Sequence, residues 1–187
     1  MTAIPTQGPA APETPSIIGL GHVGIHVHDL EASRHFWCDL LGFQVTDGSV
    51  VDGMLFLSTD PANEHHMLLL REGRTVEADG VLLQQISFIC RDLETVIELS
   101  HVLRAAGTPT MDVTHGNAVG AYFRDPDGNR CEFYWKTGLE ARQVFVKGIN
   151  LDRTATEVLE QVRQDVATFG ESGFREQVPF TLEYPSV

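Results

Sequence analysis

The sequence predicts an α+β fold made of two βαβββ modules, followed by a C-terminal extension that contains a helix. Two observations predict this fold. The order strand, helix, several short strands occurs twice along the chain, and both copies open with an alternating strand that ends in Asp-Leu-Glu. With 187 residues, 42% of them hydrophobic, the chain is long enough to bury one core, so we expect one domain.

The composition indicates which binding partners and which cellular compartment to expect. The 13 Lys and Arg against 26 Asp and Glu give a formal net charge of -13, which argues against nucleic acid and anionic membrane partners. No apolar stretch reaches the roughly 20 residues that a bilayer span needs, and we expect a cytoplasmic protein. The three cysteines are far apart in sequence and lie in apolar surroundings, which indicates reduced, mostly buried thiols.

The chain divides into three parts. Residues 1–16 are rich in Pro, Ala and Thr without periodicity and are predicted to be a disordered leader. Residues 17–138 hold the two modules, at about 17–73 and 80–138. Residues 139–187 form the extension, in which Thr154 and Glu157 have the form of a capping box that opens a helix to about Phe169. The apolar face of this helix covers either its own domain or a second subunit, and we favour its own domain.

Corresponding residues define the repeat. His22 and Gln85 each stand seven residues before the Asp of an Asp-Leu-Glu. Asp29 and Asp92 are the predicted N-caps of helices, which are expected to run from Leu30 to Leu41 and from Leu93 to Ala106. The helices end at Gly42 and Gly107, as left-handed C-terminal caps would require. Turns are predicted at residues 60–63 and 125–129.

Strand alternation places three polar side chains opposite the helices. If Val23, Ile25 and Val27 pack beneath the first helix, His22 faces the other side of the sheet, and the same argument selects Gln85 rather than Gln84. Glu132 alternates with apolar residues in the last strand of the second copy. Taken singly, such residues are usually solvated strand residues. Their equivalent places in a repeat predict a site for one divalent metal ion.

The residues also resemble a known family. The segment Gly21 to Glu31, the pair His65-His66 and the segment Tyr122 to Glu132 look like the vicinal oxygen chelate superfamily, and the resemblance spans Leu20 to Gly138. It implies that the modules form a half-open mixed β-barrel. Within the superfamily, the chain most resembles one-domain type I extradiol ring-cleaving dioxygenases, which use two histidines and a glutamate to hold Fe(II).

The resemblance implies a ligand set with one departure. His22 and Glu132 match the first histidine and the glutamate, and Gln85 stands where the second histidine should be. A carboxamide oxygen is a harder and weaker donor than imidazole, so iron is expected to be held less tightly. Glyoxalase I, in the same superfamily, uses Gln at an equivalent place. We expect Fe(II) as the cofactor, with Mn(II), Zn(II) or Ni(II) as alternatives.

Three further residues are candidates for catalysis. The resemblance assigns His66 as the acid/base group beside the metal, although both histidines of the pair could instead cap a strand at the surface. His115 lies in a loop that could close over the site, or it is an ordinary turn residue. Tyr122 lies ten residues before Glu132, as does the tyrosine that hydrogen-bonds bound catecholate in the related dioxygenases, or else it belongs to the core.

These residues favour an Fe(II)-dependent extradiol dioxygenase that acts on a catechol, with biaryl catechols among the candidate substrates, O2 as co-substrate and a role in aromatic catabolism. We also expect a homo-oligomer. Two alternatives remain. One is a glyoxalase-like, metal-dependent isomerase or lyase, for which Glu would be expected at position 66. The other is a non-catalytic small-molecule binding protein, against which the pair His22 and Glu132 argues.

Overall fold

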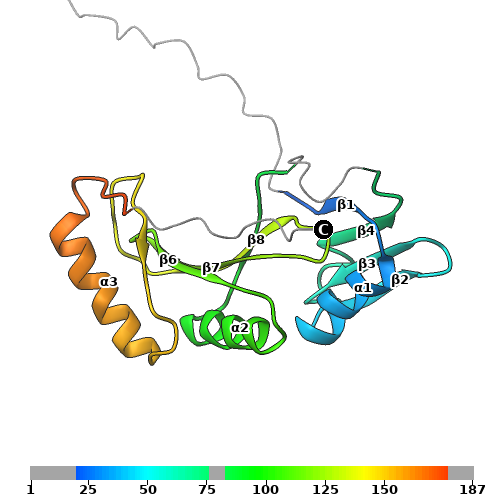
Figure 1. Ribbon diagram of the computed structural model, residues 1–187, viewed down its shortest axis with the longest axis horizontal. Coiled ribbons are helices and arrows are strands. Elements are labelled where there is room, and N and C mark those ends of the chain that lie inside the picture. The colour runs from blue at the N-terminus through cyan, green and yellow to red at the C-terminus, as the bar shows by residue number, and fades with distance from the viewer. Residues whose placement is uncertain (1–19, 76–82, 177–187) are drawn as a thin grey trace, which may run out of the picture.

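The computed structural model describes residues 20–75 and 83–176, so the predicted leader lies outside the described residues. The chain folds as the predicted α+β arrangement, with the strand-helix-strands order present twice (Figure 1). The first module contains β1 (Val23–Val27), α1 (Leu30–Arg34), η1 (His35–Leu40), β2 (Gln44–Ser49), β3 (Met54–Ser58) and β4 (Leu68–Glu72). The second contains β5 (Ile86–Ile89), α2 (Leu93–Ala105), β6 (Met111–Thr114), β7 (Ala118–Arg124) and β8 (Arg130–Lys136). The elements β9 (Lys147–Gly148) and α3 (Ala155–Phe169) follow.

Each module contributes one mixed sheet. The strand orders are β1-β4-β3-β2 and β5-β8-β7-β6-β9. The pairs β1–β4 and β5–β8 are parallel, and the other pairs are antiparallel. The two sheets thus repeat the same topology, as the sequence predicts, and they do not join into a closed barrel. The parallel pair in each module needs a long crossover connection, which contains α1 and η1 in the first module and α2 in the second.

The helix caps agree with the sequence, but the first helix is not regular. The side chains of Asp29 and Asp92 accept hydrogen bonds from Ala32 N and Thr95 N. Gly42 and Gly107 have φ values of 77° and 84°, the left-handed conformation expected beyond a helix end. The predicted single helix from Leu30 to Leu41 is instead the short α-helix α1 followed by the π-helical turns of η1. Periodicity alone could not show this change of hydrogen-bond register.

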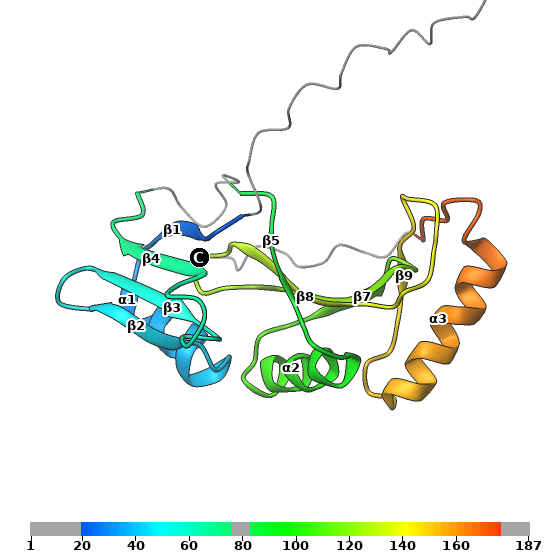
Figure 2. The same ribbon diagram turned by 180° about the vertical axis from the view of Figure 1, so that it is seen from behind.

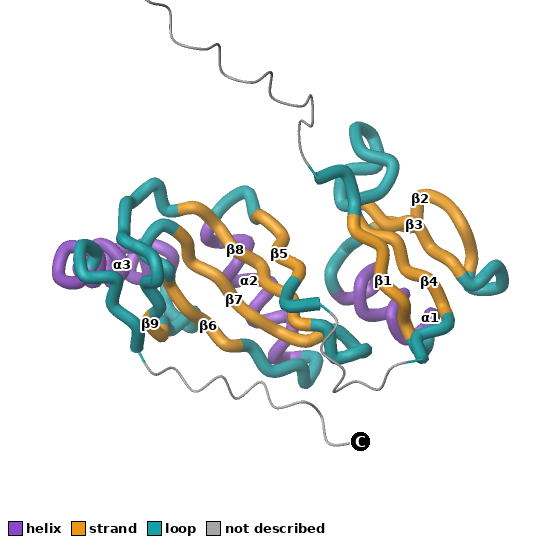
Figure 3. Tube along the Cα trace, turned by 90° about the horizontal axis from the view of Figure 1, so that it is seen from above, coloured by secondary structure: helices purple, strands orange, loops and turns teal. Residues whose placement is uncertain are grey.

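Alternation along the strands produces a layered arrangement. Val27 is fully buried and Ile25 is 9% exposed, whereas the residues that alternate with them, Gly24 and His26, are exposed. Seen from above, α1 and α2 lie on the same side of their sheets, which leaves the opposite faces uncovered by these helices (Figure 3). The faces opposite the helices are therefore free to hold functional side chains.

The modules share one hydrophobic core. Trp37 from η1 is fully buried, and its ring lies 5.5 Å from Phe88 of β5 and 6.4 Å from Phe123 of β7, centroid to centroid. A polar contact accompanies this packing, because Asp127, in the turn between β7 and β8, accepts hydrogen bonds from His28 N at 2.8 Å and from Ser33 Oγ at 3.3 Å. The His28 ring also contacts Asp127 Oδ1 at 2.6 Å.

The described part of the C-terminal extension, residues 139–176, packs on the second module, at the end remote from the first (Figure 2), and residues 177–187 lie outside the described residues. Thr154 and Glu157 form the predicted capping box of α3. Val158 and Val162 of α3 are fully buried in a cluster with Val96 of α2 and Val119 of β7, so the helix covers its own domain, as we expected. The strand β9 was not predicted, because two residues carry no periodicity. Within residues 20–75 and 83–176, none of the helices has the length and apolar character to cross a membrane.

The contact of Asp127 with the first module predicts a large effect on stability. Its side chain is only 2% exposed, so Asp127→Ala removes a buried carboxylate that accepts from the backbone of the exposed His28 and from the buried Ser33 hydroxyl. We expect this change to lower the free energy of unfolding by about 2–4 kcal/mol. In the control Asp39→Ala, the lost carboxylate is 45% exposed, and the cost should stay below about 1 kcal/mol. Urea denaturation of both variants measures this, and equal effects would contradict the interpretation.

Candidate functional site

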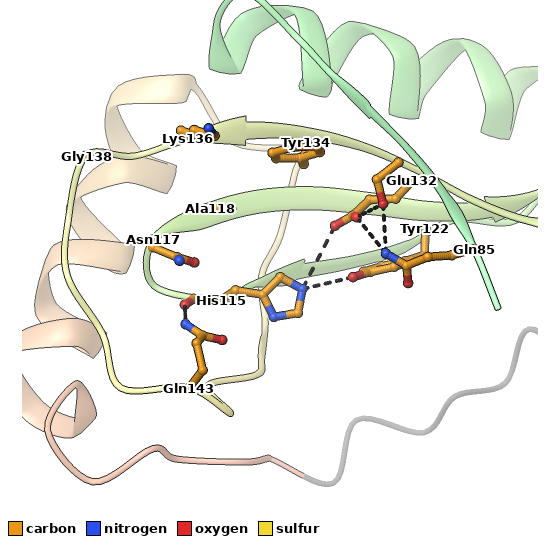
Figure 4. Close-up of a pocket in the computed structure, with 11 residues that line it drawn as sticks. Gln85, His115, Asn117, Ala118, Tyr122, Glu132, Tyr134, Lys136, Gly138 and Gln143 are labelled. Carbon is orange, nitrogen blue, oxygen red and sulfur yellow. Dashed lines mark hydrogen bonds and ion pairs between the residues drawn. The ribbon is translucent and has the colours of Figure 1, made fainter. Parts of the chain in front are cut away.

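A polar cluster lies on the uncovered face of the second sheet (Figure 4). Ser87 Oγ donates to Glu132 Oε2 at 2.6 Å, and Gln85 Nε2 lies 2.7 Å from Ser87 Oγ and 3.3 Å from Glu132 Oε2. Ser87 and Glu132 meet because they are partners in the parallel register of β5 and β8. Gln85 makes both contacts through its side-chain nitrogen, so neither contact involves its amide oxygen. That oxygen is the atom with which a carboxamide coordinates a metal.

The carboxylate of Glu132 is buried although it lies on the face of the sheet opposite the helices. Glu132 is 5% exposed. Gly120 on β7 makes room for it, because a Cβ atom at Gly120 would lie 2.7 Å from Glu132 Oε1. Glu132 Oε1 also lies 3.9 Å from Nε2 of His115, within the range of an ion pair. A buried anion whose close partners are Ser87, Gln85 and an imidazole is suited to binding a cation.

His115 and Tyr122 complete this cluster. His115 follows β6, and its Nε2 lies 3.0 Å from the hydroxyl of Tyr122 on β7. Tyr122 is 5% exposed, and it pairs with Glu132 in the antiparallel register of β7 and β8. Burial, followed by the charge of Glu132, raises the pKa of the Tyr122 phenol well above its usual range. The phenol therefore stays protonated and neutral at physiological pH.

The cluster borders an open cavity of about 720 Å³. Besides these residues, the lining includes Asn117, Tyr134, Lys136 and Gln143. Of these, Gln143 comes from the extension, and alternation alone gave no signal for it. The cavity thus brings together four of the six residues that the sequence selected, namely Gln85, His115, Tyr122 and Glu132.

The other two selected residues meet on the first sheet. The rings of His22 and His66 lie 4.2 Å apart, centroid to centroid, at the N-terminal ends of the parallel neighbours β1 and β4. His66 also contacts His65, with their Nδ1 atoms 2.9 Å apart. Burial lowers the pKa of His66, and the neighbouring His22 and His65 lower it further. His22 also borders a second, more apolar groove of about 920 Å³ between the modules, lined in part by Phe43, Met67 and Phe88.

The two groups of candidates remain separate in one chain. Within residues 20–75 and 83–176, no three His, Cys, Asp or Glu side chains come together as a group that could hold a metal ion. His22 thus lies beside His66 at the first sheet, and Gln85 lies beside Glu132 on the second. Each pair supplies two donor groups, which is half of a usual coordination shell.

Comparisons with known proteins agree with the topology. The sequence model of the Glyoxalase/Bleomycin resistance protein/Dioxygenase superfamily matches residues 19–133. A relative from Rhodococcus globerulus, biphenyl-2,3-diol 1,2-dioxygenase 3, is 32% identical over a 121-residue alignment that covers 60% of each chain. The chain thus spans well under two thirds of the length of this relative.

Solved structures show the same fold. An integron cassette protein from the mobile metagenome of the Halifax Harbour sewage outfall superposes with a TM-score of 0.51 at 27% identity, covering 64% of this chain and 99% of that one. Lactoylglutathione lyase from Agrobacterium tumefaciens has a TM-score of 0.51 at 19% identity, covering 64% of this chain and 95% of that one. The fosfomycin resistance protein FosX from Listeria monocytogenes has a TM-score of 0.50 at 21% identity, with coverage of 64% and 93%.

The family model covers more than half of the chain and takes in the first module and all of the second except the end of β8. The duplicated topology and the matching structures point the same way. The chain therefore belongs to the glyoxalase/bleomycin resistance protein/dioxygenase superfamily, also called the vicinal oxygen chelate superfamily.

Proposed function

We propose that this protein is an Fe(II)-dependent extradiol dioxygenase that cleaves the ring of a catechol-type substrate, including biaryl diols. The cluster of Glu132, Gln85, Tyr122 and His115 at one cavity carries the proposal, because it combines donors for a metal with a phenol and an imidazole that can handle a substrate proton. The relative named biphenyl-2,3-diol 1,2-dioxygenase supports the choice of substrate class.

The residues present fit a divalent metal ion. Glu132 offers a buried carboxylate, Gln85 an amide oxygen, and His22 an imidazole, and such oxygen and nitrogen donors suit Fe(II). When bound, Fe(II) would supply open positions for the two substrate hydroxyls and for O2. Tyr122 would hydrogen-bond a substrate oxygen at the cavity, and His66 would act as the acid/base group beside His22.

We further propose that two copies of the chain complete each site in a homo-oligomer. His22 and His66 would come from one copy, and Gln85 and Glu132 from the other. The separation of the two pairs on different sheets supports this arrangement, and so does the freedom of both sheets on the side away from α1 and α2 (Figure 3). A twofold axis would create two equivalent sites, each with one pair from each copy.

The activity can be tested directly. The protein is reconstituted with Fe(II) without oxygen, 2,3-dihydroxybiphenyl or a simple catechol is added, and air is then admitted. We expect a yellow ring-opened product that appears only with O2, and we expect Glu132→Gln to lower kcat/KM by more than about 100-fold because a ligand charge is lost. Turnover of a hemithioacetal without O2 would contradict the dioxygenase proposal and favour a glyoxalase-like isomerase.

The carboxamide at position 85 gives a second prediction. Gln85→His replaces a weak oxygen donor with an imidazole, so the variant should retain Fe(II) more tightly by about 10-fold. Competition with a coloured chelator measures the iron dissociation constant. The control is Gln164→His. Gln164 is exposed on α3, contacts Glu160 and does not line the cavity. Unchanged iron affinity in Gln85→His would indicate that residue 85 does not touch the metal.

Shared sites give a third prediction. His22→Ala and Glu132→Gln should each abolish activity, but a mixed dimer of the two variants contains one intact site, so it should regain about half of the wild-type activity. The matched control is a mixed dimer of His22→Ala with His66→Ala. Both changes lie in the first module, so every site stays damaged and no activity should return. A mixed dimer of His22→Ala and Glu132→Gln that stays inactive would place the whole site within one chain.

A further inference from the structure

The loop that carries His115 is held by the C-terminal extension. Gln143 Nε2 donates to the backbone oxygen of His115 at 3.0 Å, and Gln143 Oε1 accepts from Phe145 N at 3.5 Å (Figure 4 shows the first contact). The imidazole Nδ1 of His115 lies 2.9 Å from the carbonyl oxygen of Phe145. One side chain of the extension therefore joins the His115 loop to the peptide that contacts the His115 ring.

The extension is itself firmly anchored. Strand β9 pairs with β6, with Thr114 opposite Lys147, and the Phe145 side chain is fully buried. Lys147 Nζ contacts Asp165 Oδ1 of α3 at 2.6 Å, in an ion pair whose side chains are only 23% and 10% exposed. The carbonyl of Phe145 is therefore fixed by a strand, a buried ring and a helix, and not by a free chain end.

The loop and the extension are also in direct van der Waals contact. Gly116 has a φ of 73°, and a Cβ atom there would lie 2.5 Å from Ala141 Cβ and 3.1 Å from Val166 Cγ2. Only a glycine allows this approach without a shift of the neighbouring backbone. The close fit leaves the His115 loop little room to move away from Phe145.

This contact sets the tautomer of His115. A carbonyl oxygen can only accept, so Nδ1 must carry the hydrogen that bonds to Phe145 O. In the neutral ring, Nε2 is then unprotonated and accepts from the Tyr122 hydroxyl at 3.0 Å.

We propose that the C-terminal extension is a positioning element that fixes the imidazole of His115 at the cavity, with Nε2 directed at the Tyr122 hydroxyl. This inference rests on the proposed function, in which a substrate hydroxyl reaches the cavity. A His115 ring held in this way orients the Tyr122 hydroxyl, which would in turn hydrogen-bond a substrate oxygen.

Gln143 and Phe145 lie beyond residue 133, where the family match ends. A hydrogen on Nε2 instead of Nδ1 would prevent His115 from accepting the hydrogen bond of the Tyr122 hydroxyl. The extension thus affects the hydrogen bonding at the cavity as well as the packing.

The test uses Gln143→Met, which keeps the length of the side chain and removes its hydrogen bonds with His115 O, Ala141 O and Phe145 N. Gln143 is exposed, so the variant should fold normally. The control is Gln164→Met on the exposed face of α3. Nitrogen-15 NMR of histidine-labelled protein reports which ring nitrogen carries the hydrogen, and His115→Gln identifies the signals of His115.

We expect His115 of the wild-type protein to be the neutral Nδ1–H form, and Gln143→Met to show a mixture of both tautomers. With a catechol substrate, kcat should fall by about 10-fold while KM changes by less than about 2-fold. The control should change neither quantity. An Nε2–H form in the wild-type protein, or a Gln143→Met variant with unchanged tautomer and kcat, would overturn this positioning role. If the wild-type protein lacks dioxygenase activity, the proposed function fails, while the NMR result still decides whether the extension positions His115.

Discussion

The candidate sites depend on one constraint, the alternation of side chains along strands that are covered by helices on one side only. Because the apolar residues of β1, β5 and β8 pack toward the helices, the intervening residues must face the opposite side of each sheet. His26, Ser87 and Glu132 owe their direction to this rule. The direction of the candidate site residues is thus a consequence of how the core is packed.

Much of the fold could be predicted because it follows from local signals. The Asp29 and Asp92 caps, the glycines after the helices, and the capping box at Thr154 all depend on residues within a few positions of one another. The conversion of the first predicted helix to π-helical turns after Arg34, and the short strand β9, could not be predicted. Both are set by tertiary packing, of Trp37 in the shared core and of the extension against β6.

The site was predictable in its parts and not in its assembly. Alternation selected Gln85 and Glu132 correctly as neighbours on one face, and the repeat indicated His22 as their counterpart. Periodicity reports the face of a sheet but not the distance between two sheets, so it could not show that His22 would meet His66 and not Glu132. It also gave no sign of the Phe145 carbonyl, since a backbone atom leaves no signature in a sequence.

The proposed sharing of one metal ion between two copies would reconcile the two separate pairs with a single metal site. Crystals of the protein grown with Mn(II) or Fe(II), measured near the metal absorption edge, would locate the ion by its anomalous scattering. The account predicts a peak bounded by His22 of one copy and by Glu132 and Gln85 of another. A peak surrounded by residues of a single chain, or one remote from Glu132, would contradict it.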